Sequence, residues 1–251
     1  MIYLIAFLFL VLLVITAGKA GLRSGFGLVF TFVVLLFLLI PAVIHGAPPA
    51  LTTFALSLVI TAVSLIAIMG FEKKTYVCIA GTSLGIVLYC VFYLIISAAL
   101  NITGYNIPEM STLIAVGFEA DVSIGEFLFC GIMIASLGAV MDNAVSVASA
   151  AAELSAANKK AGFKELFKTS MVIARDIIGS SSNTLIMAFV GTFFVTLVLY
   201  RINSLNYDML INSYEIAVEV LRAVSASIAT ILCAPVTAII GAHVYSAKQK
   251  R

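Results

Sequence analysis

The feature that most constrains this chain is the recurrence of apolar runs of about twenty residues along nearly its whole length. A helix of that length is about 30 Å long, which matches the hydrocarbon thickness of a bilayer. Hydrophobic residues make up 63% of the chain and charged residues 10%, whereas soluble domains are about 45–50% apolar. The alternating polarity that marks transmembrane β-strands is absent from the sequence. The sequence therefore predicts an all-α, polytopic transmembrane helical bundle.

Turn signals divide the apolar sequence into about seven expected spans. Proline-containing or polar stretches separate the runs, and the Pro48-Pro49 pair ends one helix because proline lacks the amide donor. The first run has neither a basic segment in front of it nor a small-residue cleavage site behind it, so we expect a retained helix. No connecting segment is long enough for a soluble domain, so we expect residues 1–251 to form a single integral membrane domain. The expected spans lie near residues 2–17, 25–44, 50–70, 76–99, 126–150, 177–199 and 223–245.

The basic residues predict the orientation of these spans. Cytoplasmic loops of membrane proteins carry an excess of Lys and Arg. If the loops alternate, one side of the membrane receives all of the 14 basic residues except Arg201 and Arg222. We therefore expect the N-terminus outside and the C-terminus in the cytoplasm. The residues on the cytoplasmic side are then Lys19, Arg23, Lys73, Lys74, Lys159, Lys160, Lys164, Lys168, Arg175, Lys248, Lys250 and Arg251.

Two further stretches carry packing signals. Residues 153–175 are basic and have apolar residues at helical spacing, which predicts a cytoplasmic amphipathic hairpin that lies on the inner leaflet. Gly81 and Gly85 are four residues apart in an apolar run. Small residues at that spacing allow two transmembrane helices to approach closely. We therefore expect a second helix to pack on these glycines.

The most unusual polar residues lie in the fifth and sixth expected spans. Asp142 and Asn143 interrupt an otherwise apolar run, and the segment Gly179-Ser180-Ser181-Ser182-Asn183-Thr184 opens the next one. At a rise of about 1.5 Å per residue, Asp142 lies about 22 Å from the outer end of its span and Asn183 about 9 Å from the inner end of its own. Both residues thus reach a similar depth, in the inner part of the bilayer.

These polar residues predict a proton or ion site. Asp142 and Ser146 share one helix face, as do Asp176, Ser180 and Asn183. Since spans joined by a hairpin are usually neighbours, we expect the two faces to meet. Desolvation favours the neutral form of a carboxyl group, which makes Asp142 a candidate proton carrier. The candidate site comprises Asp142, Asn143, Ser146, Asn183 and Thr184, with Arg175, Asp176 and Ser180 in support.

An alternative interpretation is that Asp142 is hydrogen-bonded glue between helices. An enzyme is not expected, because the sequence lacks GxGD and HExxH motifs and a GxSx motif with a partnered histidine. No metal and no cofactor are predicted. Because the charged residues fall in short connections between apolar runs, the net charge of +2 does not indicate nucleic-acid binding. The expected environment is a lipid bilayer.

The run GAVMDNAVSVASAAAEL and the later run ELFKTSMVIARDIIGSSSNTLIMAFVGT resemble the signature of the YibE/F family of bacterial membrane proteins. The matching positions are Gly138, Ala139, Met141 and Asp142, and then Asp176, Ile177, Gly179, Asn183 and Thr184. The chain is similar to the short, YibF-like form of the family, which lacks an extra N-terminal domain. The resemblance implies a multi-pass protein of the bacterial cytoplasmic membrane and a companion membrane protein of the longer, YibE-like form.

A fainter similarity links the Asp142 helix and the hairpin after it to the membrane half of SecD/SecF and resistance-nodulation-division transporters. Taken with the residues above, it favours a subunit of a proton- or ion-coupled transport or export system that uses an intramembrane Asp. The alternative is a non-transporting membrane scaffold or assembly factor. Substituting Asp142 distinguishes these two functions.

Overall fold

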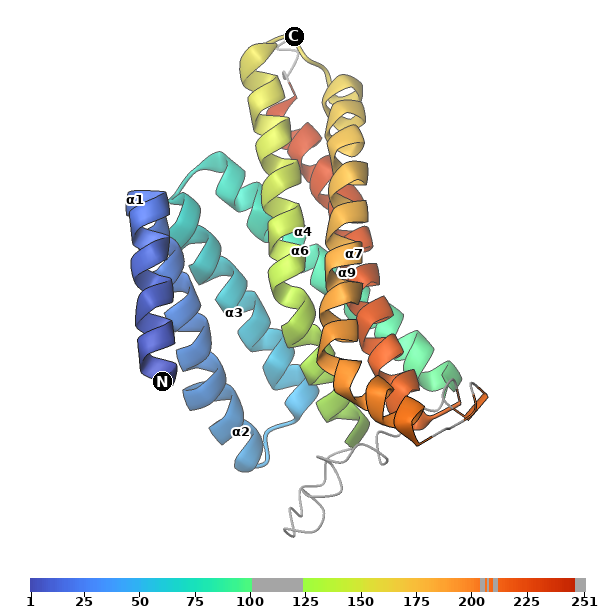
Figure 1. Cartoon of the computed structure of the whole chain (residues 1–251). Coiled ribbons are helices and arrows are strands. Elements are labelled where there is room, and N and C mark those ends of the chain that lie inside the picture. Colours follow the sequence, from blue (N-terminus) through green and yellow to red (C-terminus); the bar gives the residue numbers. More distant parts are fainter. Residues whose placement is uncertain (101–123, 204–205, 207, 210–211, 247–251) are drawn as a thin grey trace.

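The computed structural model describes residues 1–100, 124–203, 206, 208–209 and 212–246, and these residues form a helical bundle without strands (Figure 1). The predicted all-α class is therefore confirmed. Apart from the first helix, the long helices continue without a break through the apolar runs that predicted them, since backbone polar groups in lipid must bond within the segment. The elements are α1 (Ile2–Val34), η1 (Leu35–Leu39), α2 (Ile40–Ile44), α3 (Pro49–Met69), α4 (Lys73–Leu100), α6 (Ile124–Ala157), α7 (Phe163–Ile202) and α9 (Tyr214–Tyr245).

The first long helix folds back on itself. Within the described residues, six helices are long and apolar enough to cross a membrane, and the first of them runs through α1, η1 and α2 over Leu4–Ile44. Gly18 interrupts it with φ 57° and ψ −131°, a conformation that glycine adopts readily. A Cβ built on Gly25 would lie 3.3 Å from Cδ2 of Leu10, although a straight helix would separate these residues by about 22 Å. Two antiparallel legs therefore lie side by side (Figure 1), and the six membrane-length helices among the described residues are close to the seven predicted spans.

The connections that carry basic residues gather at one end of the bundle. The reversal of α1 and the connection between α3 and α4 lie at a similar level in the upper half of Figure 1, and the turn between α6 and α7 lies beyond them in the same direction. Lys19, Lys73 and Lys159 belong to these segments. Such clustering is what the positive-inside rule requires of cytoplasmic loops. The assignment of this end to the cytoplasm stays a prediction.

The core lies where α4, α6 and α9 meet. On its apolar side, the ring of Tyr89 on α4 stacks on Phe129 of α6 with centroids 6.2 Å apart. A Cβ on Gly81 would lie 2.9 Å from the Cβ of Thr237 on α9, and one on Gly85 would lie 2.8 Å from the Cβ of Cys233. These distances are shorter than a carbon–carbon contact allows. The glycine pair thus confirms the predicted close packing and identifies α9 as the partner helix.

Helices α6 and α7 extend beyond the thickness of a bilayer. With 34 and 40 residues, they are about 51 Å and 60 Å long. The predicted hairpin is present as the adjoining ends of these two helices, but its expected position on the inner leaflet is wrong. Leu166, Ser170 and Ala174 of α7 are buried, and Leu166 packs with Ala242 of α9. The apolar face of this segment is covered by protein, and residues 163–175 form the first part of the long helix α7.

Candidate functional site

A buried polar joint centred on Asn143 connects three helices. The Asn143 side chain of α6 is completely buried. Its Oδ1 accepts a hydrogen bond of 2.8 Å from the Ser181 hydroxyl of α7, and its Nδ2 donates one of 3.5 Å to the Thr230 carbonyl of α9. A buried amide is costly unless it is hydrogen-bonded, and both ends of this one find partners. Asn143 therefore fixes how α6, α7 and α9 lie against one another.

The local sequence explains why these three groups can meet. Val140, Ala144 and Val147, which flank Asn143 on the inner face of α6, are buried, and the adjacent Ala144 is small. Ala226 and Ala229 line α9 at the same contact and are also buried. Small side chains let helices approach closely enough for a side-chain amide to reach a backbone carbonyl. The Thr230 carbonyl is within reach for this reason.

Asp142, the central residue of the predicted site, faces away from this joint. Its side chain is exposed on the outer face of α6, and it forms no hydrogen bond or ion pair with any described residue. Ser146, one turn further along α6, is half-buried. A carboxyl group without a partner at membrane depth is energetically unfavourable when ionised. The expectation that the next helix of this chain shields Asp142 is therefore wrong.

The polar residues of α7 also face outward. Arg175, Asp176, Ser180, Asn183 and Thr184 are all exposed, and the Thr184 hydroxyl donates to the Ser180 carbonyl of its own helix. The two predicted polar faces thus do not meet, because both helices are rotated so that these faces point outward. The two polar segments nevertheless lie at the same level, since Asn143 is hydrogen-bonded to Ser181. The helices meet through the neighbours of the predicted residues.

Ser181 and Thr230 are the members of the joint that sequence reasoning missed. Ser181 lies in the polar segment of α7 but one position from Ser180 on the expected face, which is a rotation of about 100° around the helix. Thr230 contributes its backbone carbonyl, so its side chain carries no signal for the contact. The adjacent pair Asp142-Asn143 gave a usable signal, because consecutive residues differ by about 100° around a helix and two polar neighbours therefore point in different directions.

The outer faces of α6 and α7 combine polar groups with open space. A Cβ built on Gly131 or Gly138 of α6 would meet no atom within 4 Å, and the same holds for Gly179 and Gly191 of α7. Gly138 precedes Asp142 by four residues and therefore shares its face. This outer face could accept a closely packed helix. The part of the chain that the structure describes contains no group of three His, Cys, Asp or Glu side chains arranged for a metal ion.

The Ser181→Ala substitution tests the joint. We expect it to lower the free energy of unfolding by about 0.6–1.5 kcal/mol, because the buried Oδ1 of Asn143 loses its donor. Unfolding in mixed detergent micelles measures this change. Thr192→Ala is the matched control, because the exposed Thr192 hydroxyl bonds only to the Ala188 carbonyl of its own helix. Equal losses in the two variants would contradict a stabilising role for the joint.

Comparison with known proteins gives one family. The sequence profile described as YibE/F-like protein matches residues 5–247, which is nearly the whole chain. No match was found among curated proteins or solved structures.

Proposed function

We propose a function for this chain, which belongs to the YibE/F-like family and is an integral membrane protein. In this proposal it is a non-enzymatic subunit of a proton- or ion-coupled transport or export system. Asp142 is the proposed proton carrier. The observation that carries this proposal is that Asp142 lies within α6, a helix long and apolar enough to cross a membrane, where its side chain is exposed and without a partner among the described residues. The proposed location is the bacterial cytoplasmic membrane.

Proton exchange at Asp142 follows from the cost of its charge. An ionised Asp at the centre of a membrane helix costs about 2.5–3.5 kcal/mol on insertion scales. Uptake of a proton removes that cost while the carboxyl group faces lipid or an apolar partner. An aqueous path or a basic group would favour the ionised form instead. The Asp142 side chain thus has a neutral and an ionised state, and each state is favoured in a different environment.

The joint at Asn143 supplies a way to couple these states to movement. Asn143 follows Asp142 directly, so a rotation of α6 that moves one residue also moves the other. Such a rotation would change the hydrogen bonds that connect Asn143 to Ser181 and Thr230. Helices with two alternative packings can convert a local change of charge into a larger rearrangement. The proposed coupling therefore runs from Asp142 through Asn143 to α7 and α9.

A companion membrane protein completes the proposed site. Asn183, Thr184 and Asp142 would otherwise present polar groups to lipid, which is costly. The neighbouring glycines leave room for a helix backbone. The partner we propose is a YibE-like membrane protein of the longer form, whose helix brings small residues and a hydrogen-bond donor to Asp142. An interhelical hydrogen bond of this kind contributes about 0.6–2 kcal/mol.

Labelling with a hydrophobic carbodiimide tests proton binding without knowledge of the substrate. The reagent reacts with protonated carboxyl groups and partitions into the membrane. In sealed membrane vesicles we expect modification of Asp142 that slows as the pH rises and changes when a proton gradient is imposed. The Asp142→Asn variant provides the background. Absence of modification at every pH, or a rate indifferent to the gradient, would contradict the proposal.

A non-transporting scaffold is the second candidate function. Asn143 favours the scaffold function, because its buried side chain is hydrogen-bonded to two other helices and thereby stabilises a fixed arrangement of helices. In that case Asp142 would serve as a hydrogen-bonding contact to the companion and would not need to ionise. The two candidate functions predict different effects of the Asp142→Asn substitution on activity.

A further inference from the structure

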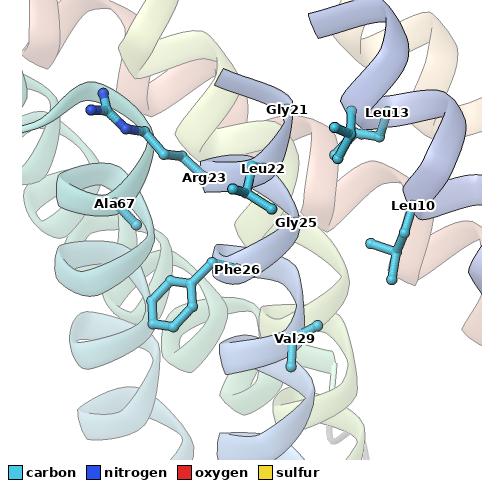
Figure 2. A pocket seen from close by; sticks show the side chains of 10 residues that line it. Leu10, Leu13, Gly21, Leu22, Arg23, Gly25, Phe26, Val29 and Ala67 are labelled. Carbon is cyan, nitrogen blue, oxygen red and sulfur yellow. The ribbon is translucent and has the colours of Figure 1, made fainter. Parts of the chain in front are cut away.

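An apolar groove lies on the outer surface of the folded-back first helix, away from Asp142. It has a volume of about 690 Å³. Figure 2 shows Leu10 and Leu13 on the first leg, Leu22, Phe26 and Val29 on the second, and Ala67 on the neighbouring helix α3. Both legs belong to α1. The groove thus lies along the second leg, between the first leg and α3.

Two glycines let the two legs approach each other closely at the edge of this groove. Gly21 and Gly25 are one turn apart and belong to the groove lining, so the second leg has no side chain at either position. The two legs are closest near Gly21, where an added Cβ would overlap the Leu13 carbonyl. Leu22, Phe26 and Val29 are exposed. From Gly21 to Val29 the groove follows the helix for about 12 Å, and it opens on the outer surface of the protein.

A positive charge lies at the end of this groove. Arg23 belongs to its lining, and its side chain is exposed. Among the described residues, neither Arg23 nor the nearby Lys19 forms an ion pair. Both residues follow the reversal at Gly18, so they lie at the end of the bundle where the other basic segments gather (Figure 1). In a bilayer crossed by this bundle, basic residues at the end of the spans would lie near the phosphate groups of the lipids.

We propose that this groove binds one acyl chain of an anionic phospholipid whose phosphate is held by Arg23. The guanidinium of Arg presents a fork of N–H donors that matches phosphate oxygens. The apolar walls accept a hydrocarbon chain, and they offer nothing to a free phosphate ion. Charge and polarity thus point to a lipid, with an anionic headgroup above and a chain below. This site goes beyond the transport role and does not depend on it.

A bound lipid would also stabilise the fold of the first two passes. The leg before Gly18 covers residues 2–17, a length of about 24 Å, and is therefore shorter than the hydrocarbon core of about 30 Å. Few contacts hold it, since the residues from Leu4 to Ala17 are all exposed or half-buried. An acyl chain between this leg and α3 would add apolar contacts on both sides.

Native mass spectrometry of the full chain in detergent, with added phosphatidylglycerol or phosphatidylcholine of identical acyl chains, tests this site. We expect the wild type to retain phosphatidylglycerol about fivefold better, since one basic residue near the membrane surface contributes about 1 kcal/mol. Arg23→Gln should abolish that preference. Lys73→Gln should keep it, because Lys73 is an exposed basic residue at the same end of the bundle but outside the groove.

The apolar part of the site is tested by filling the groove. Val29→Trp should lower the retention of both lipids, whereas Val195→Trp, at an exposed position of α7, should leave it unchanged. The proposal is overturned if Arg23→Gln keeps the preference, if Lys73→Gln loses it equally, or if Val29→Trp retains both lipids. Binding of inorganic phosphate that competes with the lipid would overturn the lipid as occupant. A dimer that dissociates in Val29→Trp would identify a second copy as the occupant.

Discussion

Asp142→Asn is expected to abolish proton-driven activity while leaving the fold of the chain intact. The amide has nearly the same shape as the carboxyl group and still forms hydrogen bonds, but it cannot release or bind a proton at working pH. Because Asp142 is exposed and has no partner among the described residues, we expect the free energy of unfolding to change by less than about 0.5 kcal/mol. Growth of cells at low pH, or proton-driven transport in vesicles, measures the activity.

The same substitution separates the transport subunit from the scaffold. A scaffold needs only the hydrogen bond, so Asp142→Asn would keep its activity and its companion protein. Asp142→Leu removes the hydrogen bond as well, and in a scaffold it should release the companion during purification. Glu153→Gln is the matched control, because Glu153 is an exposed acid of the same helix about 16 Å closer to its end. Full activity of Asp142→Asn would exclude the proposed proton carrier.

The level of the two polar segments relative to each other could be predicted from the sequence, but their rotation could not. The relative level follows from a constant rise per residue, and the bond between Asn143 and Ser181 shows that the two segments lie side by side. Rotation depends on which face of a helix is covered by neighbours. Because α6 is apolar or small on all sides, its polarity has no period that points to the core. Of the adjacent pair Asp142 and Asn143, packing rather than pattern selected Asn143 for the interior.

The N-terminal part of α7 is a second case in which the sequence could not predict which neighbour covers a helix face. Leu166 and Ala174 follow helical spacing, which predicts one apolar face but not what covers it. A lipid surface and another helix are equally good partners for such a face. Ala238 and Ala242 of α9 are buried against it, so contacts between distant parts of the chain decide the outcome. By contrast, the glycine pair of α4 predicted helix packing correctly, because glycine in an apolar run has few other uses.

Gly81→Leu is expected to cost about 3 kcal/mol or more in the free energy of unfolding, the largest stability effect among the substitutions considered. An added Cβ would lie 2.9 Å from the Cβ of Thr237, and the remaining side-chain atoms would have to enter the contact between α4 and α9. Overpacking of this kind forces helices apart or side chains out of their preferred rotamers. Unfolding of the full chain in mixed detergent micelles measures the loss.

Gly191→Leu is the control for this prediction. A Cβ at Gly191 would meet no atom within 4 Å, so the substitution should be neutral or should stabilise α7 by up to about 1 kcal/mol through helix propensity. Thr230 lies on α9 two turns before Thr237. Movement of α9 away from α4 would therefore also disturb the bond from Asn143 to the Thr230 carbonyl. If Gly81→Leu were as stable as Gly191→Leu, α4 and α9 could not be in close contact, and the position of α9 that brings Thr230 to Asn143 would lose its support.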